Sequence, residues 1–232
     1  MQFEKISTPS LKELFITQLE NKILSGELKV GEKLPSEREL AASMKVSRAV
    51  VNTGIAEMEQ KGFLVVKPRI GTFVEDYRRN GTLETLVSIM KYNGGNLARE
   101  EVKSVLELRI VLVNLATSLC IEHATNEELF ILKKKLENVK SSKGNEELIE
   151  STFALYHEIA FLSKNVLLPL FFVSFKELVC RLWLRYILNY GPDALIKNNT
   201  ILVERILVRD KEGVTSHVTD TTMEAISGEK KI

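Results

Sequence analysis

The sequence contains little cysteine, proline and histidine, and these shortages exclude several classes of protein. Its 232 residues include two cysteines, five prolines and three histidines. Cys120 and Cys180 lie in apolar, helix-like stretches and form no Cys-x-x-Cys pair, so we exclude a disulfide scaffold and expect two buried free thiols. Hydrophobic residues make up 44% of the chain and charged residues 27%, which also excludes disordered and collagen-like proteins.

An excess of charge of one sign is also missing. Lysine and arginine total 32, aspartate and glutamate total 31, and the formal net charge is +1. This balance excludes a protein that coats nucleic acid through bulk charge. It still allows a local basic surface that recognises one specific site.

Long hydrophobic runs are absent as well. The most apolar run, VLLPLFFVSF at residues 166–175, is about half as long as a membrane span and contains Pro169. The N-terminal MQFEKISTPSLKE lacks the basic and then apolar layout of a signal peptide. We therefore expect residues 166–175 to form a buried helix in a cytoplasmic protein that does not associate with a membrane.

The first part of the chain contains clear signals for three helices. Apolar residues recur every three or four positions over residues 11–23, and the pattern stops near Gly26. Ser36 and Glu39 form a capping box at the start of a short second helix. Ser47 caps a third helix that ends near the Lys-Gly pair at residues 61–62.

Two short β-prone runs follow, FLVV and TFV, and the turn residues KPRIG separate them. Three helices and a hairpin within residues 1–75 predict a winged helix-turn-helix domain, although some winged helices make only protein contacts. Residues 76–81 are charged and aperiodic, and we interpret them as a linker.

From residue 82 to residue 232 apolar residues keep a helical period, and one apolar helix is expected over residues 166–188. Short polar turns separate the helical stretches. We predict an all-α domain of six or seven helices in this region, and hence a mainly α fold for the whole chain.

Candidate DNA-binding residues gather at the third helix and around it. In a helix-turn-helix the second helix of the motif presents its N-terminal residues to base edges in the major groove. Ser47 would leave N–H groups for a phosphate, Arg48 has the fork geometry for guanine or phosphate, and Asn52, on the same face, can pair with adenine. Between residues 41 and 72, five basic residues stand against two acidic ones. The further candidates lie on the second helix, in the turn and at the hairpin tip: Arg38, Lys45, Arg69 and Gly71.

The stretch LPSERELAASMKVSRAVV, followed by KGFLVVKPRIGTFV, resembles the signature of GntR-family transcription regulators, which are bacterial proteins. The resemblance implies that Arg38 and Arg48 contact DNA, that Ser47 is a phosphate-binding cap, and that Gly71 lies in the wing beside the minor groove. The family usually has Arg-Glu where this chain has Asn-Thr at residues 52–53. We therefore expect its operator to differ from the common one, or its affinity to be lower.

The helical remainder resembles the FadR branch of that family, whose C-terminal FCD domain binds a ligand and mediates dimerisation. Many members hold a metal ion with one Asp and three His side chains. When this chain is aligned with the family pattern in the register that matches best, the positions of the metal ligands are occupied by Thr152, Tyr156, Asn198 or Asn199, and Thr221. We therefore predict that this domain binds no metal and no other cofactor.

Four polar residues on otherwise apolar helices are candidates for an effector pocket: Arg109, Tyr156, Arg181 and Asn199. Each of them can instead make a structural hydrogen bond or salt bridge. The fatty-acyl-CoA-responsive members of the branch also lack the metal, which makes an apolar or acyl effector one alternative. Their basic cluster near the last helix is replaced here by HVTDTT.

Together these features predict a ligand-responsive repressor of transcription that binds a palindromic double-stranded DNA operator as a homodimer. One alternative is a winged-helix protein that binds DNA constitutively, without an effector. A helical enzyme is disfavoured, because the sequence has no Ser/His/Asp order, HExxH motif, Walker loop or Gly-rich dinucleotide turn.

Overall fold

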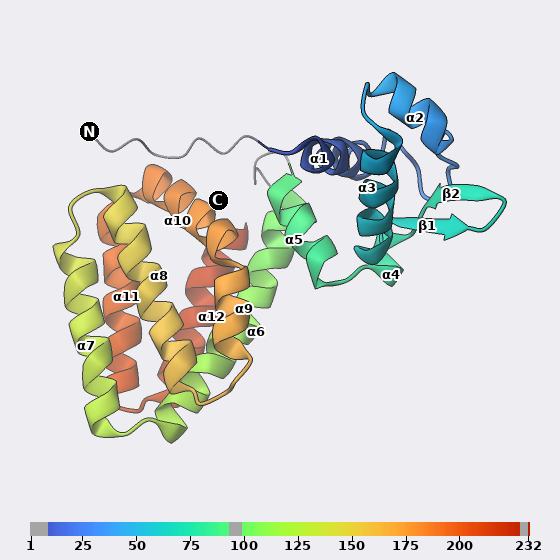
Figure 1. The fold of residues 1–232 in the computed structure, drawn as a ribbon. Helices are drawn as coiled ribbons and strands as arrows, with labels where there is room; N and C mark the ends of the chain where they lie inside the picture. The colour runs from blue at the N-terminus through green and yellow to red at the C-terminus, as the bar shows by residue number, and fades with distance from the viewer. Residues whose placement is uncertain (1–8, 93–98, 228–231) are drawn as a thin grey trace, which may run out of the picture. The chain divides into compact units, whose positions relative to one another are not determined.

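The computed structural model describes residues 9–92, 99–227 and 232, and the chain forms two compact units that divide between residues 96 and 97 (Figure 1). We call the part up to residue 96 the N-terminal unit and the part from residue 97 the C-terminal unit. Each unit has its own hydrophobic core.

The N-terminal unit is built on three helices, α1 (Leu11–Leu24), α2 (Glu37–Ser43) and α3 (Arg48–Gln60). Each begins after a serine whose hydroxyl accepts a hydrogen bond from a backbone N–H three residues on, which satisfies one free donor of the first turn. At α1 and α2 a glutamate completes the capping box. The predicted caps of α2 and α3 are confirmed.

Gly54 allows α3 to pack closely against α1. A Cβ atom at residue 54 would lie 2.4 Å from Cδ1 of Phe15, which is much closer than non-bonded carbon atoms approach. Phe15 shares its core with Val51, Ile55 and Met58 of α3. Glycine weakens a helix interior, so its use here reflects the close approach of the two helices. This contact fixes which face of α3 is exposed.

Strands β1 (Leu64–Lys67) and β2 (Gly71–Val74) form the predicted antiparallel hairpin. Leu64 pairs with Val74, and both side chains are buried in the core of the unit. The other end of the hairpin is exposed, so it extends from the three helices as a wing (Figure 1).

Two further helices, α4 (Tyr77–Asn80) and α5 (Leu83–Lys91), belong to the N-terminal unit. On α5, the Thr85 hydroxyl donates to the backbone carbonyl of Lys61, the residue that follows α3, and the Ser88 hydroxyl donates to the Glu20 carboxylate at 2.8 Å. The sequence predicts a linker at residues 76–81, whereas the division in the structure comes after α5.

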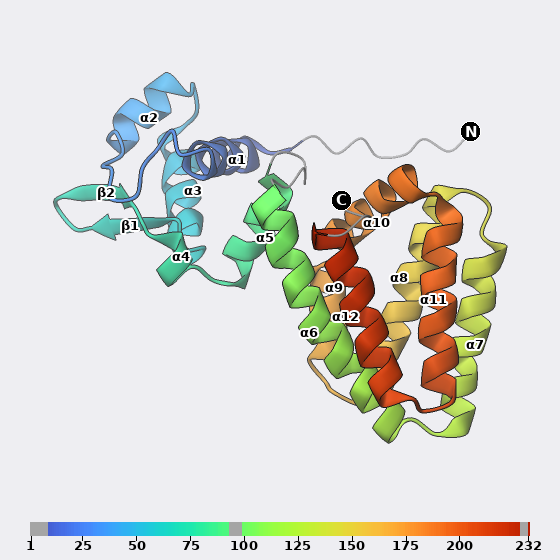
Figure 2. The same ribbon diagram turned by 180° about the vertical axis from the view of Figure 1, so that it is seen from behind.

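The C-terminal unit is all-helical. Between residues 99 and 227 it comprises seven helices: α6 (Arg99–His123), α7 (Asn126–Ser141), α8 (Asn145–Leu162), α9 (Leu168–Ser174), α10 (Lys176–Tyr190), α11 (Pro192–Leu207) and α12 (Lys211–Ser227). Helix α6 packs along α12, and α7 packs along α8 and α11 (Figure 1 and Figure 2). The predicted fold class, a winged helix-turn-helix followed by an all-α domain, is confirmed.

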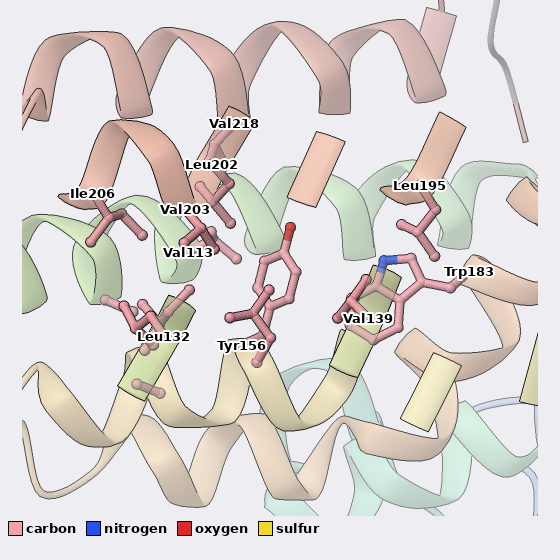
Figure 3. Close-up of a cluster of buried hydrophobic side chains, with 14 of the residues drawn as sticks. Val113, Leu132, Val139, Tyr156, Trp183, Leu195, Leu202, Val203, Ile206 and Val218 are labelled. Atoms are coloured by element: carbon pink, nitrogen blue, oxygen red, sulfur yellow. The ribbon is translucent and has the colours of Figure 1, made fainter. Parts of the chain in front are cut away.

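The core of the C-terminal unit contains aromatic residues that carry polar groups. Figure 3 shows Tyr156 of α8 and Trp183 of α10 among aliphatic residues such as Leu195, Leu202 and Val218. Helix α8 contacts α6, α7, α9 and α10, so it lies at the centre of the packing. A residue on α8 therefore has neighbours from several helices.

The expectations for residues 166–188 are wrong in two respects. The helix is broken at Phe175, where ψ is 1° and the aromatic ring turns into the core. The run at residues 166–175 is also only partly buried: Leu168 is 3% exposed, but 83% of Val166 and 63% of Leu170 are accessible to solvent. The short helix α9 carries apolar side chains on all of its sides. When one side packs on α8, the apolar side chains of the opposite side therefore face outward.

Among the described residues, α6 alone is long and apolar enough to cross a membrane by length and composition. It packs against α8 and α12, and Val113, Ala116 and Cys120 lie in the core. In this structure α6 is a core helix of the C-terminal unit.

Candidate nucleic-acid interface and candidate effector cavity

The N-terminal end of α3 presents an exposed polar face. The Ser47 hydroxyl accepts a hydrogen bond from the backbone N–H of Val50 at 3.3 Å. Arg48 and Asn52 are exposed and lie four residues apart, hence on one side of the helix, whereas Val51 is fully buried. This face offers a guanidinium, an amide and the free N–H groups of a first helical turn to phosphates and base edges.

Further basic side chains surround this face. Arg38 on α2 and Lys45 in the turn before α3 are exposed. Lys45 has a φ of 53°, the left-handed conformation that lets the chain turn sharply between the two helices. In the described part of the N-terminal unit, Arg38, Lys45, Arg48 and Arg69 form no ion pair, whereas other cations do: Lys12, Lys22, Lys61 and Arg79. The charges of the candidate residues are therefore available to a polyanion.

The hairpin tip carries Arg69 and Gly71. Arg69 is exposed, and its φ of 64° places it in the turn. Gly71 has a φ of 134°, which residues with a side chain rarely adopt, and a Cβ atom there would lie 2.7 Å from Cε of Lys33. Glycine therefore allows Lys33 to lie close against the wing.

Two lysines of the wing are not among the predicted site residues. The Nζ atoms of Lys33 and Lys67 lie 6.0 and 4.9 Å from the centroid of the Phe73 ring, which holds both cations on the hairpin. Lys33 reaches the hairpin through an isolated bridge to Phe73, a contact that local sequence rules do not reveal. For Lys67, its position beside the turn of the predicted hairpin was the sequence signal that could have identified it as a DNA-binding candidate.

The C-terminal unit contains a cavity of two adjoining chambers, with volumes of about 50 and 60 Å³. Arg109, Tyr156 and Trp183 line both chambers. The remaining lining of the first chamber is apolar, and its aromatic residues are Phe153, Phe171, Phe172 and Phe175. The second chamber also contains polar side chains: Asn198, His217, Thr221 and Thr222.

The half-buried guanidinium of Arg109 connects α6 with α8 and α12. Its Nη2 donates to the Tyr156 hydroxyl at 3.1 Å, and its Nη1 donates to the Thr222 hydroxyl. Its Cζ lies 5.5 Å from the centroid of the Tyr156 ring, and that ring packs against Trp183 with centroids 5.4 Å apart. Both hydrogen-bond acceptors are neutral, so no ion pair with a described residue compensates the charge of Arg109.

Of the four residues predicted for the pocket, the structure brings Arg109 and Tyr156 together and leaves Arg181 and Asn199 outside the lining. Arg181 is exposed on α10 and forms an ion pair with Glu177 at 2.8 Å. Asn199 is fully buried, and its Nδ2 donates to the Thr152 hydroxyl at 3.1 Å. Arg181 and Asn199 thus make the salt bridge and the structural hydrogen bond that the sequence left open.

Thr222 is a cavity residue that the sequence interpretation missed. On α12 the buried residues are Val214, Val218, Thr222 and Ala225, which recur at steps of three and four. A threonine in an otherwise apolar stripe was the signal that could have identified it.

His217 lines the second chamber in its neutral form. Its Nε2 lies 3.0 Å from the carbonyl oxygen of Asn198, and a carbonyl only accepts, so Nε2 carries the proton. Burial above all, and then the positive charges of Arg205 and Arg109, lower the pKa of the imidazole. Arg109 is thus the one charged side chain among the described residues that line the two chambers.

The side chains of this region do not fit a metal ion. The positions that correspond to metal ligands in the FadR branch offer neutral oxygen atoms: Thr152, Tyr156, Asn198 or Asn199, and Thr221. The guanidinium of Arg109 beside Tyr156 would repel a divalent cation. Within residues 9–92, 99–227 and 232 no group of three or more His, Cys, Asp or Glu side chains could hold a metal. That the protein binds no metal stays a prediction.

Two protein families match the chain. Residues 12–74 match a family described as bacterial regulatory proteins of the gntR family, and residues 104–221 match the FCD domain. The first match runs from α1 to β2 and includes all the predicted DNA-binding residues. The second covers most of the C-terminal unit.

Similar curated proteins are transcription regulators. The HTH-type transcriptional regulator LutR of Bacillus subtilis is 31% identical over 147 residues, or 63% of this chain and 65% of LutR. Mce2R of Mycobacterium tuberculosis is 33% identical over 47% of this chain and 45% of its own length. The repressor NanR of Escherichia coli is 29% identical over 69% of this chain and 60% of its own length. The chain thus spans less than two thirds of each of these relatives.

A solved structure shares the fold. Lar, which controls the expression of the Listeria monocytogenes agr system, superposes with a TM-score of 0.57 over 95% of this chain and 97% of its own. The sequence identity is 14%, so this likeness concerns the fold alone.

Proposed function

Because the chain belongs to the GntR family of bacterial regulatory proteins and carries an FCD domain, we propose that it is a DNA-binding transcription regulator that responds to a small-molecule effector. The relatives that it matches are regulators and not enzymes. In this proposal the N-terminal unit binds double-stranded DNA, the cavity of the C-terminal unit binds the effector, and the protein acts in the cytoplasm.

The exposed N-terminal face of α3 is the observation that carries this proposal. Arg48 and Asn52 are positioned to reach base edges in the major groove, and the first turn capped by Ser47 is positioned to bind a phosphate. The cations on α2 and in the following turn, Arg38 and Lys45, contact the DNA backbone. Arg69, which is exposed at the hairpin tip, enters the neighbouring minor groove beside Gly71.

We further propose that the protein binds a palindromic operator as a homodimer and represses transcription. Two copies related by a two-fold axis would place two α3 helices about 34 Å apart, in successive major grooves on one side of the DNA. NanR, one of the relatives, is a repressor, which supports the same outcome here. Because Asn52 recognises adenine where an arginine would recognise guanine, the operator differs from that of relatives with arginine at this position.

Selection of DNA from a random-sequence pool by the purified full chain tests the proposal. The affinity for the selected sequence is then measured by fluorescence anisotropy for the wild type and for Arg48→Ala. Loss of a bidentate contact to guanine costs about 1–3 kcal/mol, so Arg48→Ala is expected to weaken binding about 10- to 100-fold. Arg78→Ala is the matched control, because Arg78 is an exposed arginine on α4 of the same unit and lies outside α2, α3 and the hairpin.

A pool that yields no enriched sequence would contradict the proposal. An Arg48→Ala protein with wild-type affinity would contradict the role given to α3. An unchanged affinity in Arg78→Ala shows that the loss does not follow from removing any positive charge of the unit.

A further inference from the structure

The cavity of the C-terminal unit contains a cation that has no charged partner within the described part of the chain. Elsewhere in the chain, Arg79, Arg181 and Arg205 each form an ion pair with a carboxylate. Arg109 has no carboxylate within ion-pair distance among the described residues, and its hydrogen bonds go to the hydroxyls of Tyr156 and Thr222. A half-buried cation that lacks an anion is costly, and a bound anion would offset that cost.

The two hydroxyl groups beside Arg109 can themselves donate to a ligand. A hydroxyl accepts through its lone pairs and donates its single proton. The hydroxyls of Tyr156 and Thr222 accept from Arg109, and neither donates a hydrogen bond within the described part of the chain. A guanidinium and two O–H donors therefore lie together where the two chambers adjoin. This donor set suits a carboxylate, which accepts several charge-assisted hydrogen bonds.

The lining and the size of the first chamber determine which group the ligand can carry beyond its carboxylate. Its lining beyond Arg109 is apolar and strongly aromatic, with Phe153, Phe172 and Trp183 from three different helices. An apolar group that enters it leaves water and gains free energy. A cavity of ~150 Å³ holds benzene, and the chambers here measure about 50 and 60 Å³. Even together they are smaller than that, so they suit a short aliphatic body better than a ring or a long acyl chain.

We infer that this cavity binds a small organic carboxylate directly through Arg109 and the hydroxyls of Tyr156 and Thr222, with no metal ion between protein and ligand. The neutral oxygen atoms at the positions of the metal ligands and the guanidinium beside them support the same conclusion. The inference rests on the proposed function in one respect, which is that the carboxylate would be the effector. Binding itself is measured without DNA.

Trp183 provides the readout, because it is the single tryptophan of the chain and lines both chambers. The full chain is titrated with acetate, propionate and butyrate in buffer with EDTA, and each acid is compared with its neutral amide. At least one carboxylate is expected to change the Trp183 emission with a Kd below ~1 mM. Its amide is expected to bind at least ~10-fold more weakly, because hydrogen bonds to a charged group are the stronger ones.

Three variants locate the binding energy. Arg109→Met removes the charge and keeps most of the side-chain length, so carboxylate affinity falls at least ~10-fold and the preference for acid over amide disappears. Tyr156→Phe keeps the ring beside Trp183 and removes only the hydroxyl, so it causes a smaller loss. Arg181→Met is the matched control, because this arginine is exposed and lies outside the cavity lining. Thermal melts establish that each variant is folded, and Arg109→Lys replaces Arg109→Met if the latter is not.

The inference is wrong if amides bind as tightly as acids, if Arg109→Met keeps wild-type affinity, or if none of the carboxylates changes the Trp183 emission. It is also wrong if binding needs an added divalent ion and is lost in EDTA. These failures are distinct from failure of the proposed function. A protein that binds its selected DNA but no carboxylate contradicts only the inference, whereas one that binds a carboxylate but no DNA contradicts only the proposed function.

Discussion

The two units of the chain carry their candidate sites on opposite kinds of surface. In the N-terminal unit Arg48 and Asn52 are exposed, and the core beneath them only holds α3 in place. In the C-terminal unit Tyr156 is 6% exposed and lies inside the core, with the half-buried Arg109 against it. Site and core are therefore separate in the first unit and shared in the second. Substitutions of the exposed residues should separate DNA binding from stability, whereas substitutions in the cavity should not fully separate effector binding from stability.

The largest expected effect is on the stability of the N-terminal unit. The Phe63 side chain is fully buried, so Phe63→Ala should lower the free energy of unfolding by about 3–5 kcal/mol. Urea unfolding followed by circular dichroism measures this change. Trp183 fluorescence follows the C-terminal unit separately, and its transition should move little because each unit has its own core.

Phe161→Ala is the matched control for Phe63→Ala. This phenylalanine of α8 is 63% exposed, and its removal should change stability by less than about 0.5 kcal/mol. Equal shifts of both transitions in Phe63→Ala would show that the two units do not unfold as separate cores.

A second prediction concerns the cysteines of the C-terminal unit. Both are free, but Cys120 is buried whereas Cys180 is only half-buried, which corrects the expectation of two buried thiols. Burial raises the pKa of the Cys120 thiol to about 12, and burial, with the nearby charge of Glu150, raises the pKa of Cys180 to about 11. A raised pKa keeps the thiol protonated, so at pH 8 both should react with a disulfide reagent about 100-fold more slowly than a free thiol, or slower still.

The reaction rates are measured from the absorbance of the product that the disulfide reagent releases. In the Cys120→Ser variant, Cys180 is the one thiol left, so its rate is measured alone. The rate of Cys180 should rise with pH up to about its raised pKa, and unfolding in urea should release both thiols. A Cys180 thiol that reacts at the free-thiol rate at pH 8 in the folded protein would contradict the packing described for α10.

A smaller effect is expected at the contact between α1 and α3. Gly54→Ala would place a Cβ atom 2.4 Å from the Phe15 ring, and overpacking of this kind costs about 1–3 kcal/mol, partly offset by the better helix propensity of alanine. Thermal unfolding measures the loss, with Thr53→Ala on the exposed face as control. Because Gly54 also sets the position of α3, the affinity for selected DNA should fall in Gly54→Ala beyond the change in Thr53→Ala. An unchanged melting temperature would show that α1 can move away without cost.

The fold of the N-terminal unit and the exposure of its candidate residues could be predicted because the rules are local. Ser36 and Ser47 cap helices through residues three positions away, and Arg48 and Asn52 share a face because of helical spacing. Contacts that cross the unit, such as Lys33 with the wing, were not accessible to these rules.

The cavity of the C-terminal unit was only partly predictable. Helical period identifies which residues are buried, but it does not tell whether a buried polar group faces a cavity or another side chain. The Nδ2 of Asn199 donates to Thr152, which is 47 residues away in sequence, while its buried Oδ1 has no hydrogen-bond partner among the described residues. Glu177 four residues before Arg181 was a local sign of a surface ion pair. The break at Phe175 has no glycine or proline at its position, so local sequence rules give no signal for it.

One paired measurement tests the central claim, that the outside of the first unit binds DNA and the inside of the second binds a carboxylate. Selected-DNA affinity without ligand and carboxylate-induced Trp183 emission are recorded for Arg48→Ala and for Arg109→Met. Arg48→Ala should lose DNA binding and keep the full carboxylate response, whereas Arg109→Met should lose the carboxylate response and still bind DNA. The account is contradicted if the two variants lose the same property, or if neither variant loses either one.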